Sequence, residues 1–180
     1  MRVITGTARG RKLTALEGDS VRPTSDMVKE AIFSIIQFDI DGAMVLDLFS
    51  GTGQLGIEAI SRGAKECRFV DQSSESLKVT RENIALCGFN GKATVTQANA
   101  VDFLRQARLT FDIALLDPPY NKGLIPEALP LLAPHMSDRG IIVCEHEKEL
   151  SLPDEAGGMI KKKTYRYGKI GLTVYRRPED

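Results

Sequence analysis

The glycine-rich segment "VLDLFSGTGQLG" (45–56) constrains the fold of this chain more than any other stretch. Gly51, Gly53 and Gly56 stand in G-x-G-x-x-G spacing, between a run typical of a buried strand and a run typical of a helix. Glycines let the backbone turn tightly and approach a ligand closely. A strand, a glycine turn and a helix in this order predict the ligand-binding edge of an α/β sheet.

The rest of the chain continues the alternation of strands and helices. We predict strands over 43–50, 66–72, 92–97, 111–117 and 140–146, helices over 25–38, 54–63, 73–88, 100–108 and 124–136, and two last strands that turn at Gly168–Lys169. This alternation indicates an α/β, Rossmann-like fold, in which a mostly parallel, doubly wound sheet carries helices on both faces. The two last strands depart from the alternation and predict an antiparallel strand at the sheet edge.

Length and composition indicate one domain of a soluble protein. The chain has 180 residues, of which 42% are hydrophobic and 27% charged, and no apolar run could span a membrane. We divide it into a short basic, β-rich extension (1–20) and a core (21–180). Cys67, Cys87 and Cys144 are far apart and indicate reduced thiols, hence a cytoplasmic protein.

The charges are unevenly distributed although they sum to zero. Residues 1–29 hold six Lys or Arg against three acids, and residues 159–178 hold seven against none. Such asymmetry indicates a polyanionic partner. The alternative is that Lys161, Lys162 and Lys163 coat a solvent-exposed edge strand.

Two acidic residues narrow the ligand of the glycine turn. Asp71 ends the following strand, twenty residues beyond Gly51, where a carboxylate can accept the hydroxyl protons of a ribose. Asp47 precedes Gly51 by four residues. A carboxylate there suits a ligand with an ammonium group, such as S-adenosylmethionine, and would repel the pyrophosphate of NAD. An alternative role for Asp47 is to hold the glycine turn by accepting backbone N–H bonds.

The segment "DPPY" (117–120) follows the fourth predicted strand, which lies beside the first in a doubly wound sheet. An exocyclic amine of a nucleobase is a poor nucleophile, because its lone pair is delocalised into the ring. The Asp117 carboxylate and the Pro118 carbonyl could each accept one N–H and aim the lone pair at a methyl donor. Pro119 would stiffen the turn and Tyr120 would stack on the base. The alternative is a rigid turn with Tyr120 as a packing residue.

The motifs "DLFSGTG", "VDQ" and "DPPY" resemble those of class I S-adenosylmethionine-dependent methyltransferases that modify exocyclic amines. "GRKL" (10–13), "RPTSDMVKEAIFSII" (22–36), "DLFSGTGQLGIEAISRGA" (47–64) and "YGKIGLTVYRR" (167–177) narrow the resemblance to the bacterial 16S rRNA guanine-N2 methyltransferases of the RsmD family. The resemblance implies transfer of a methyl group from S-adenosyl-L-methionine to N2 of a guanine in small-subunit ribosomal RNA. It also implies a seven-stranded sheet whose last strand is antiparallel.

The resemblance assigns roles to residues by their position. Asp117, Pro118, Pro119 and Tyr120 would hold the guanine amine. The cofactor would be surrounded by Arg22, Pro23, Thr24, Asp47, Phe49, Gly51, Gly53, Asp71, Gln72, Asn99, Ala100 and Asp117. Asn99 stands where the family pattern has an acid, and its carbonyl would accept the adenine amino group more weakly. We expect His146, for which no role emerges, to be a surface residue.

The basic residues Arg9, Arg11, Lys12, Lys161, Lys162 and Lys163 are the candidate phosphate contacts to RNA. We expect a monomer without a metal, with 16S rRNA or the small ribosomal subunit as its partner. Three other functions stay open at this point: a DNA adenine-N6 methyltransferase, a nicotinamide-dependent oxidoreductase, and a non-catalytic RNA-binding assembly protein. The intact Asp117–Tyr120 segment argues against the last of these.

Overall fold

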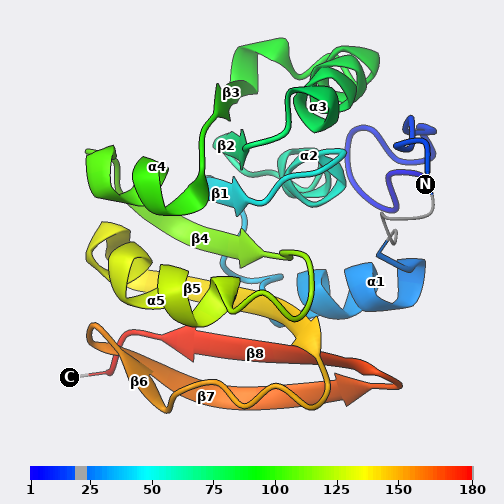
Figure 1. Ribbon diagram of the computed structural model, residues 1–180. Helices are drawn as coiled ribbons and strands as arrows, with labels where there is room; N and C mark the ends of the chain where they lie inside the picture. The colour runs from blue at the N-terminus through cyan, green and yellow to red at the C-terminus, as the bar shows by residue number, and fades with distance from the viewer. Residues whose placement is uncertain (19–23, 180) are drawn as a thin grey trace.

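The computed structural model describes residues 1–18 and 24–179, which form one mixed sheet flanked by helices (Figure 1). The strands are β1 (Met44–Leu48), β2 (Glu66–Asp71), β3 (Ala93–Gln97), β4 (Phe111–Leu116), β5 (Met136–Glu147), β6 (Glu155–Ala156), β7 (Met159–Tyr167) and β8 (Ile170–Arg176). The helices are α1 (Asp26–Ile35), α2 (Gln54–Ser61), α3 (Ser74–Leu86), α4 (Ala100–Gln106) and α5 (Leu124–Leu132), with 3-10 turns η1 (Asn90–Lys92) and η2 (Ala133–His135). The predicted alternation of strands and helices is confirmed.

Five parallel strands form one half of the sheet, in the order β3-β2-β1-β4-β5. β1 lies between β2 and β4, and Asp47 of β1 is level with Leu115 of β4. From β1 the chain therefore first builds the sheet in one direction, through β2 and β3, and then in the other, through β4 and β5. The carboxyl ends of β1, β2 and β4 meet at one edge, which is where open α/β sheets bind ligands.

Helices cover both faces of this sheet, as predicted (Figure 1). The core between the sheet and helices α1, α2 and α3 contains Val45 and Ile113. The core between the sheet and helices α4 and α5 contains Leu46 and Ala114. Successive residues of one strand thus enter opposite cores, as the two-residue period of a strand requires. Because both faces are covered, β1 and β4 are nearly continuous apolar runs.

Antiparallel strands form the other half of the sheet: β8 pairs with β5, β7 with β8, and β6 with β7. The last strand is antiparallel and follows a turn at Gly168–Lys169, as predicted. The sheet has eight strands rather than seven, because the two residues of β6 fold back on β7 through Gly157 and Gly158. These glycines have φ angles of 58° and 89°, which residues with a side chain rarely adopt. β5 also begins at Met136 rather than at 140.

Residues 1–18 form an extension that is held by side chains of the helices. Its β pairing is a single bridge between Arg2 and Lys12. The prediction of a β-rich extension is therefore wrong. Glu58 of α2, which is buried, accepts the Ile4 N–H at 2.8 Å and the Thr5 N–H at 3.1 Å. These two bonds from backbone donors to one carboxylate replace the pairing that a strand would have given.

Glu58 and Asn83 connect the extension to the rest of the fold. Glu58 also contacts the buried Lys29 of α1, with 3.6 Å between the Lys29 Nζ and the carboxylate. Asn83 of α3 donates from Nδ2 to the Thr14 carbonyl at 3.0 Å and to the Thr52 carbonyl at 2.9 Å. The same amide therefore contacts the extension and the glycine turn.

His146 is buried, which contradicts the expectation of a surface residue. Its Nδ1 donates to the Glu147 carbonyl at 2.7 Å, because a carbonyl can only accept. Its Nε2 then accepts the Thr173 hydroxyl at 2.7 Å. The ring lies over Gly171 of β8, where a Cβ would overlap it. His146 is therefore part of the packing between β5 and β8.

The cysteines are free thiols, as expected. Cys67 and Cys144 are buried in the two cores and Cys87 is half-buried. Burial raises the pKa of the Cys67 thiol well above its usual value, which makes it a poor nucleophile. Among the described helices, none has the length and apolar character needed to cross a membrane.

Gly56 tests the close packing of α2 on β2. A Cβ at Gly56 would lie inside contact distance of the Phe69 ring and the Cys67 sulfur. We expect Gly56→Ala to lower the free energy of unfolding by about 1–3 kcal/mol, the usual effect of overpacking, as measured by urea titration. Gly91→Ala is the matched control, since nothing lies within 4 Å of its Cβ position. Equal stability of the two variants would contradict close packing at Gly56.

Candidate functional site

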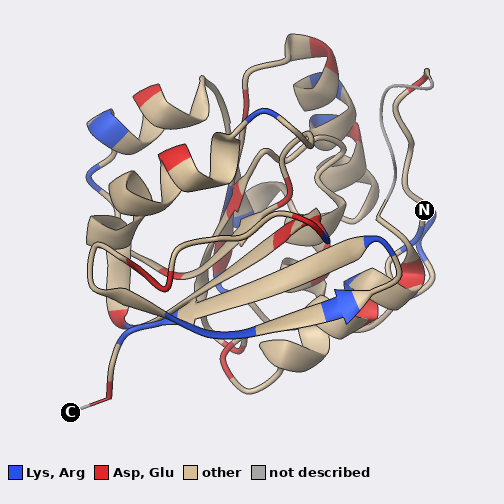
Figure 2. Cartoon of the chain, turned by 60° about the horizontal axis from the view of Figure 1, so that its bottom comes forward, with Lys and Arg blue, Asp and Glu red and all other residues tan. Residues whose placement is uncertain are grey.

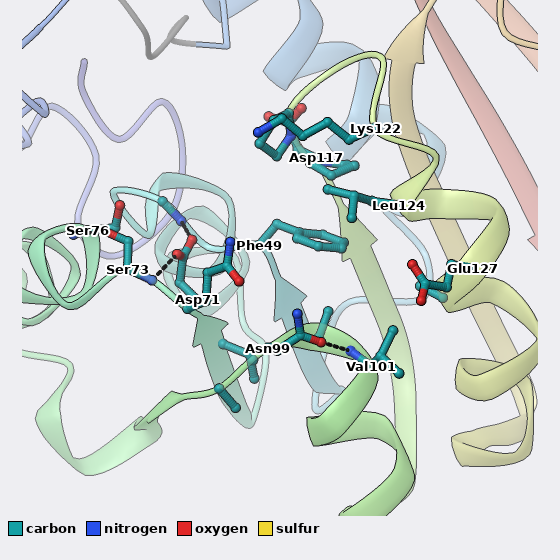
Figure 3. A pocket seen from close by; sticks show the side chains of 18 of the residues that line it. Phe49, Asp71, Ser73, Ser76, Asn99, Val101, Asp117, Lys122, Leu124 and Glu127 are labelled. Carbon is teal, nitrogen blue, oxygen red and sulfur yellow. Dashed lines mark hydrogen bonds between the residues drawn. The ribbon is translucent and has the colours of Figure 1, made fainter.

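A cavity of about 700 Å³ opens at the carboxyl ends of the parallel strands (Figure 3). The loops after β1, β2, β3 and β4 line it, together with α5. It contains ten of the residues predicted from the sequence: Phe49, Gly51, Asp71, Gln72, Asn99, Ala100, Asp117, Pro118, Pro119 and Tyr120. The fold thus places the glycine turn and the "DPPY" segment on one cavity.

Asp71 at the end of β2 holds the glycine turn. Its Oδ2 accepts the Gly51 N–H and its Oδ1 accepts the Ser73 N–H, each at 2.9 Å. The side chain lies at the cavity wall (Figure 3), and each carboxylate oxygen has a second lone pair for another donor. Asp71 can therefore accept ribose hydroxyl protons while the backbone fixes its orientation.

Phe49 begins the loop after β1 in a strained backbone conformation. Its φ is 81°, a left-handed value that costs a residue with a side chain about 1–3 kcal/mol. The Phe49 N–H donates to the Val70 carbonyl at 3.0 Å, which holds this conformation against β2. The ring consequently lies in the middle of the cavity, between Asp71 and Leu124 (Figure 3).

A second cavity, of about 330 Å³, adjoins the first and shares Phe49, Gly51 and Asp117 with it. Asp47 of β1 lines the second cavity and is almost completely buried. Its Oδ2 accepts the Gly56 N–H at 3.0 Å. Asp47 therefore holds the start of α2, the alternative that the sequence left open, and it does so at the wall of a ligand-sized space.

Two other polar atoms at the second cavity have no hydrogen-bond partner within the described part of the chain. They are Ser50 Oγ and Gln54 Oε1, and both are buried. A buried polar atom without a partner is costly, and the Gln54 oxygen can only accept. An acceptor of this kind next to Asp47 fits a ligand that brings ammonium donors. A hydroxyl such as Ser50 can donate to a carboxylate. The donor and acceptor set therefore fits the amino-acid part of S-adenosylmethionine.

Three carboxylates, those of Asp47, Asp71 and Asp117, surround the two cavities. Burial raises the pKa of Asp47 from 3.8 to about 7, and the charges of Asp117 and Asp71 add to this rise while the bond from Gly56 opposes it. A cationic ligand would relieve the repulsion among the carboxylates, and a pyrophosphate would increase it. The electrostatics of the site favour a sulfonium cofactor over NAD.

Asp117 follows β4 directly and is hydrogen-bonded to Thr24, which lies just before Ser25, the N-cap of α1. The Thr24 hydroxyl donates to Asp117 Oδ2 at 2.9 Å, so the structure places Thr24 at the site. Arg22 and Pro23, the other two residues of the expected closing loop, lie outside the described residues. Gly53, which the resemblance assigned to the cofactor, has a φ of 82° and precedes α2 as its N-cap.

Asn99 lines the cavity and caps α4 with its side-chain oxygen. The oxygen accepts the N–H groups of Val101 at 2.9 Å and Asp102 at 3.4 Å, as is usual for an N-cap. That this oxygen also accepts the adenine amino group stays a prediction. The Asn99 Nδ2 points toward the cavity (Figure 3).

Several residues at the site carry no motif and were missed by sequence reasoning. The cavity is also lined by Leu16, Ser73, Ser76, Lys122, Leu124 and Glu127. Leu16 comes from the extension, and Glu127 comes from the first turn of α5. Glu145 of β5 contacts Thr24, with 3.2 Å between the Thr24 hydroxyl and its Oε2. These residues can be recognised as part of the site only from their positions in the fold.

The candidate RNA contacts lie in two separate places (Figure 2). Arg9, Arg11 and Lys12 are exposed on the extension. Lys161–Lys163 lie on β7, three strands away from β4. Through β8 and β5, the register places these lysines level with the middle of β4. Lys161 also pairs with Asp154 at 2.9 Å. The structure therefore does not bring the two basic groups together at the cavity.

The described residues, 1–18 and 24–179, contain no group of three or more acidic, histidine or cysteine side chains that could hold a metal ion.

The ionisation of Asp47 can be tested through stability. Its pKa is raised from 3.8 to about 7, so the folded state binds the proton more tightly than the unfolded chain, and the stability of the protein falls as pH rises through this window. We compare the unfolding free energy of Asp47→Asn with that of the unchanged protein at pH 4 and at pH 8. We expect this difference to be about 2–4 kcal/mol more in favour of Asp47→Asn at pH 8 than at pH 4. Urea titrations of both proteins at the two pH values measure this. An unchanged difference between them would show that Asp47 does not titrate in this window.

The chain matches one protein family and several curated relatives over nearly its whole length. The family described as "Conserved hypothetical protein 95" matches residues 1–176. "Putative rRNA methyltransferase YlbH" of Bacillus subtilis (strain 168) is 37% identical over 98% of this chain and 99% of its own. "Ribosomal RNA small subunit methyltransferase D" of Escherichia coli (strain K12) is 32% identical over 98% of this chain and 90% of its own.

The fold is shared with solved structures. The structure described as "Putative methyltransferase yhhF from Escherichia coli" superposes with a TM-score of 0.87 at 33% identity, covering 98% of this chain and 97% of that chain. The motifs, the sheet order and these relatives agree. The chain belongs to the family described as "Conserved hypothetical protein 95", which is the RsmD methyltransferase family that its motifs predicted.

Proposed function

We propose that this protein transfers a methyl group from S-adenosyl-L-methionine to the exocyclic N2 amine of a guanine in small-subunit (16S) ribosomal RNA. The observation that carries the proposal is the convergence of the Asp117–Tyr120 segment and the glycine turn on one cavity. The relatives whose names refer to rRNA methyl transfer support the choice of ribosomal RNA.

The two adjoining cavities suit the two ends of the cofactor. In the larger one Asp71 would accept the ribose hydroxyls, with Gln72 and Ala100 beside the adenosine. In the smaller one Asp47 and the unpaired Gln54 oxygen would accept the ammonium group. When bound, the cofactor supplies a methyl group that its sulfonium makes electrophilic.

Asp117 and Pro118 would hold the amine for reaction. The Asp117 carboxylate accepts one N–H and the Pro118 carbonyl accepts the other, which directs the nitrogen lone pair toward the methyl group. The bound cofactor would supply the methyl group and keep the electron pair of its carbon–sulfur bond, and the amine nitrogen would lose one proton. The Asp117 carboxylate would accept that proton. Stacking of Tyr120 on the base would contribute about 1–3 kcal/mol.

The product of the reaction tests this function directly. Tritiated S-adenosylmethionine is incubated with small ribosomal subunits that lack the modification, and separately with naked 16S rRNA, and the nucleosides are then separated. Label in N2-methylguanosine is the expected result. Label in N6-methyladenine would favour an adenine methyltransferase, and no label in either substrate would contradict the proposal.

Asp117→Ala tests the role of the "DPPY" segment. We expect methyl transfer to fall by at least about 100-fold, because the amine loses an acceptor that positions it. Cofactor affinity, measured by calorimetry, should change much less, since most cofactor contacts lie elsewhere. Asp138→Ala, a change at an exposed residue of β5, is the matched control and should be fully active. Full activity of Asp117→Ala would exclude the proposed mechanism.

RNA is the polyanion that the basic residues would contact. The exposed Arg9, Arg11 and Lys12 precede Ala15 and Leu16, which line the smaller cavity. A strand of RNA that reaches Asp117 across the extension would therefore pass close to these three charges. Lys161–Lys163 lie farther away, so we expect them to contact a different part of the RNA.

Two triple variants test these contacts separately: Arg9, Arg11 and Lys12 changed to Ser, and Lys161, Lys162 and Lys163 changed to Ser. Each phosphate contact contributes about 0.7–0.9 to the slope of log affinity against log salt. We expect each variant to lower the slope by about 2, with the larger loss of affinity in the extension variant. Fluorescence anisotropy over a salt series measures both. A variant with unchanged affinity and slope would remove its three residues from the interface.

A further inference from the structure

Glu145 is a buried carboxylate that the proposed mechanism does not use. It lies on β5 with only 1% of its surface exposed. The β4–β5 register pairs Leu116 with Cys144, so the next residues, Asp117 and Glu145, follow side by side. Alternation along the strands places both side chains on the face that α1 covers. Two carboxylates are thus neighbours at the edge of the cavity.

Thr24 joins these two carboxylates. Its hydroxyl lies 2.9 Å from Asp117 Oδ2 and 3.2 Å from Glu145 Oε2, and the residue is 5% exposed. A hydroxyl carries one hydrogen, so both acceptors share this donor. The bond to Oδ2 fixes the plane of the Asp117 carboxylate, and this plane determines the direction of the other oxygen.

We propose that Glu145 is a positioning residue, which acts through the Thr24 hydroxyl to hold the Asp117 carboxylate in the orientation that receives the target amine. The inference rests on the proposed function of Asp117. Glu145 does not contact the reacting atoms in this arrangement. Its part is to hold the Thr24 hydroxyl on the side from which that hydroxyl reaches Asp117.

The core alone does not account for an acid at this position. The four preceding residues of β5, 141–144, are apolar and buried, and a charge in such surroundings is costly, the more so beside a like charge. An apolar residue would pack at 145 without that cost. Among the contacts of Glu145, the one to the hydroxyl that orients Asp117 connects this acid to the candidate site.

The test is a double-mutant cycle with Thr24→Val and Glu145→Gln, which preserve shape and remove the hydroxyl or the charge. Thr24→Ser keeps the hydroxyl and is the conservative rescue. Glu147→Gln, a change on the same strand that is not in contact with Thr24, is the matched control. For each protein, kcat and KM are measured with small ribosomal subunits, cofactor affinity by calorimetry, and folding by urea titration.

We expect Thr24→Val and Glu145→Gln each to lower kcat by about 10- to 100-fold, the range that misplacement of a reacting group produces. KM and cofactor affinity should stay within about two-fold, and Thr24→Ser and Glu147→Gln should keep most of the activity. The kcat of the double variant should be about that of the less active single variant, because both changes break the same connection.

Three results would overturn the inference. Glu145→Gln could have the kcat of the unchanged protein, or the two losses could multiply in the double variant, which would make the residues independent. If Glu145→Gln did not fold, equal activity of Thr24→Ser and Thr24→Val would have the same consequence, since the hydroxyl would then have no role.

Failure of the proposed function is visible separately, as absence of methyl transfer by the unchanged protein. In that case the connection is read from the ¹³C chemical shift of the Asp117 carboxyl at pH 8. Glu145→Gln should move this resonance farther in the unchanged protein than in the Thr24→Val background, where only the direct effect of the lost charge remains. A resonance that Glu145→Gln moves equally in both backgrounds, or in neither, would show that Glu145 does not act through Thr24.

Discussion

The position of β1 at the point where the sheet changes its direction of growth is the constraint on which the site depends. β1 is bonded to β2 on one side and to β4 on the other, so the loops that follow these strands leave the sheet edge and diverge around a shared space. Asp71 at the end of β2 and Asp117 just after β4 both line that space. Between them, the buried Asp47 of β1 accepts the Gly56 N–H and holds the start of α2, which follows the glycine turn. Three acids far apart in the sequence thus form one electrostatic environment.

Most of the fold could be predicted because its signals are local. Apolar runs, helix periodicity and glycines at the ends of elements identify each strand and helix of the parallel half, and strand alternation determines its topology. The extension was misread because its partners are Glu58 and Asn83, helix residues whose contacts no local pattern encodes. The two-residue strand β6 and the burial of His146 were not predicted for the same reason. Each depends on contacts with a neighbouring strand, which no local pattern encodes.

The candidate site was predictable where chemistry and motif coincide. Asp71 and Asp117 end strands beside recognisable segments, and the structure places both on the cavity. The capping role of Asn99, whose oxygen accepts the N–H groups of Val101 and Asp102, was not predicted, because the motif marks this residue only as a ligand contact. Glu145 has no motif at all, since an acid within an apolar strand shows its purpose only once Thr24 and Asp117 are placed beside it.

The way the extension is held joins the cavity to the helix packing. Ala15 and Leu16 form part of the cavity wall, and the segment before them buries Val3, Ala8 and Leu13 in the core that α1, α2 and α3 share. Its backbone is also hydrogen-bonded to Glu58 and Ser61 of α2 and to Asn83 of α3. Part of the cavity wall is therefore built on helix packing and not on strand pairing, so a change in that packing would reshape the cofactor space while the sheet stays the same.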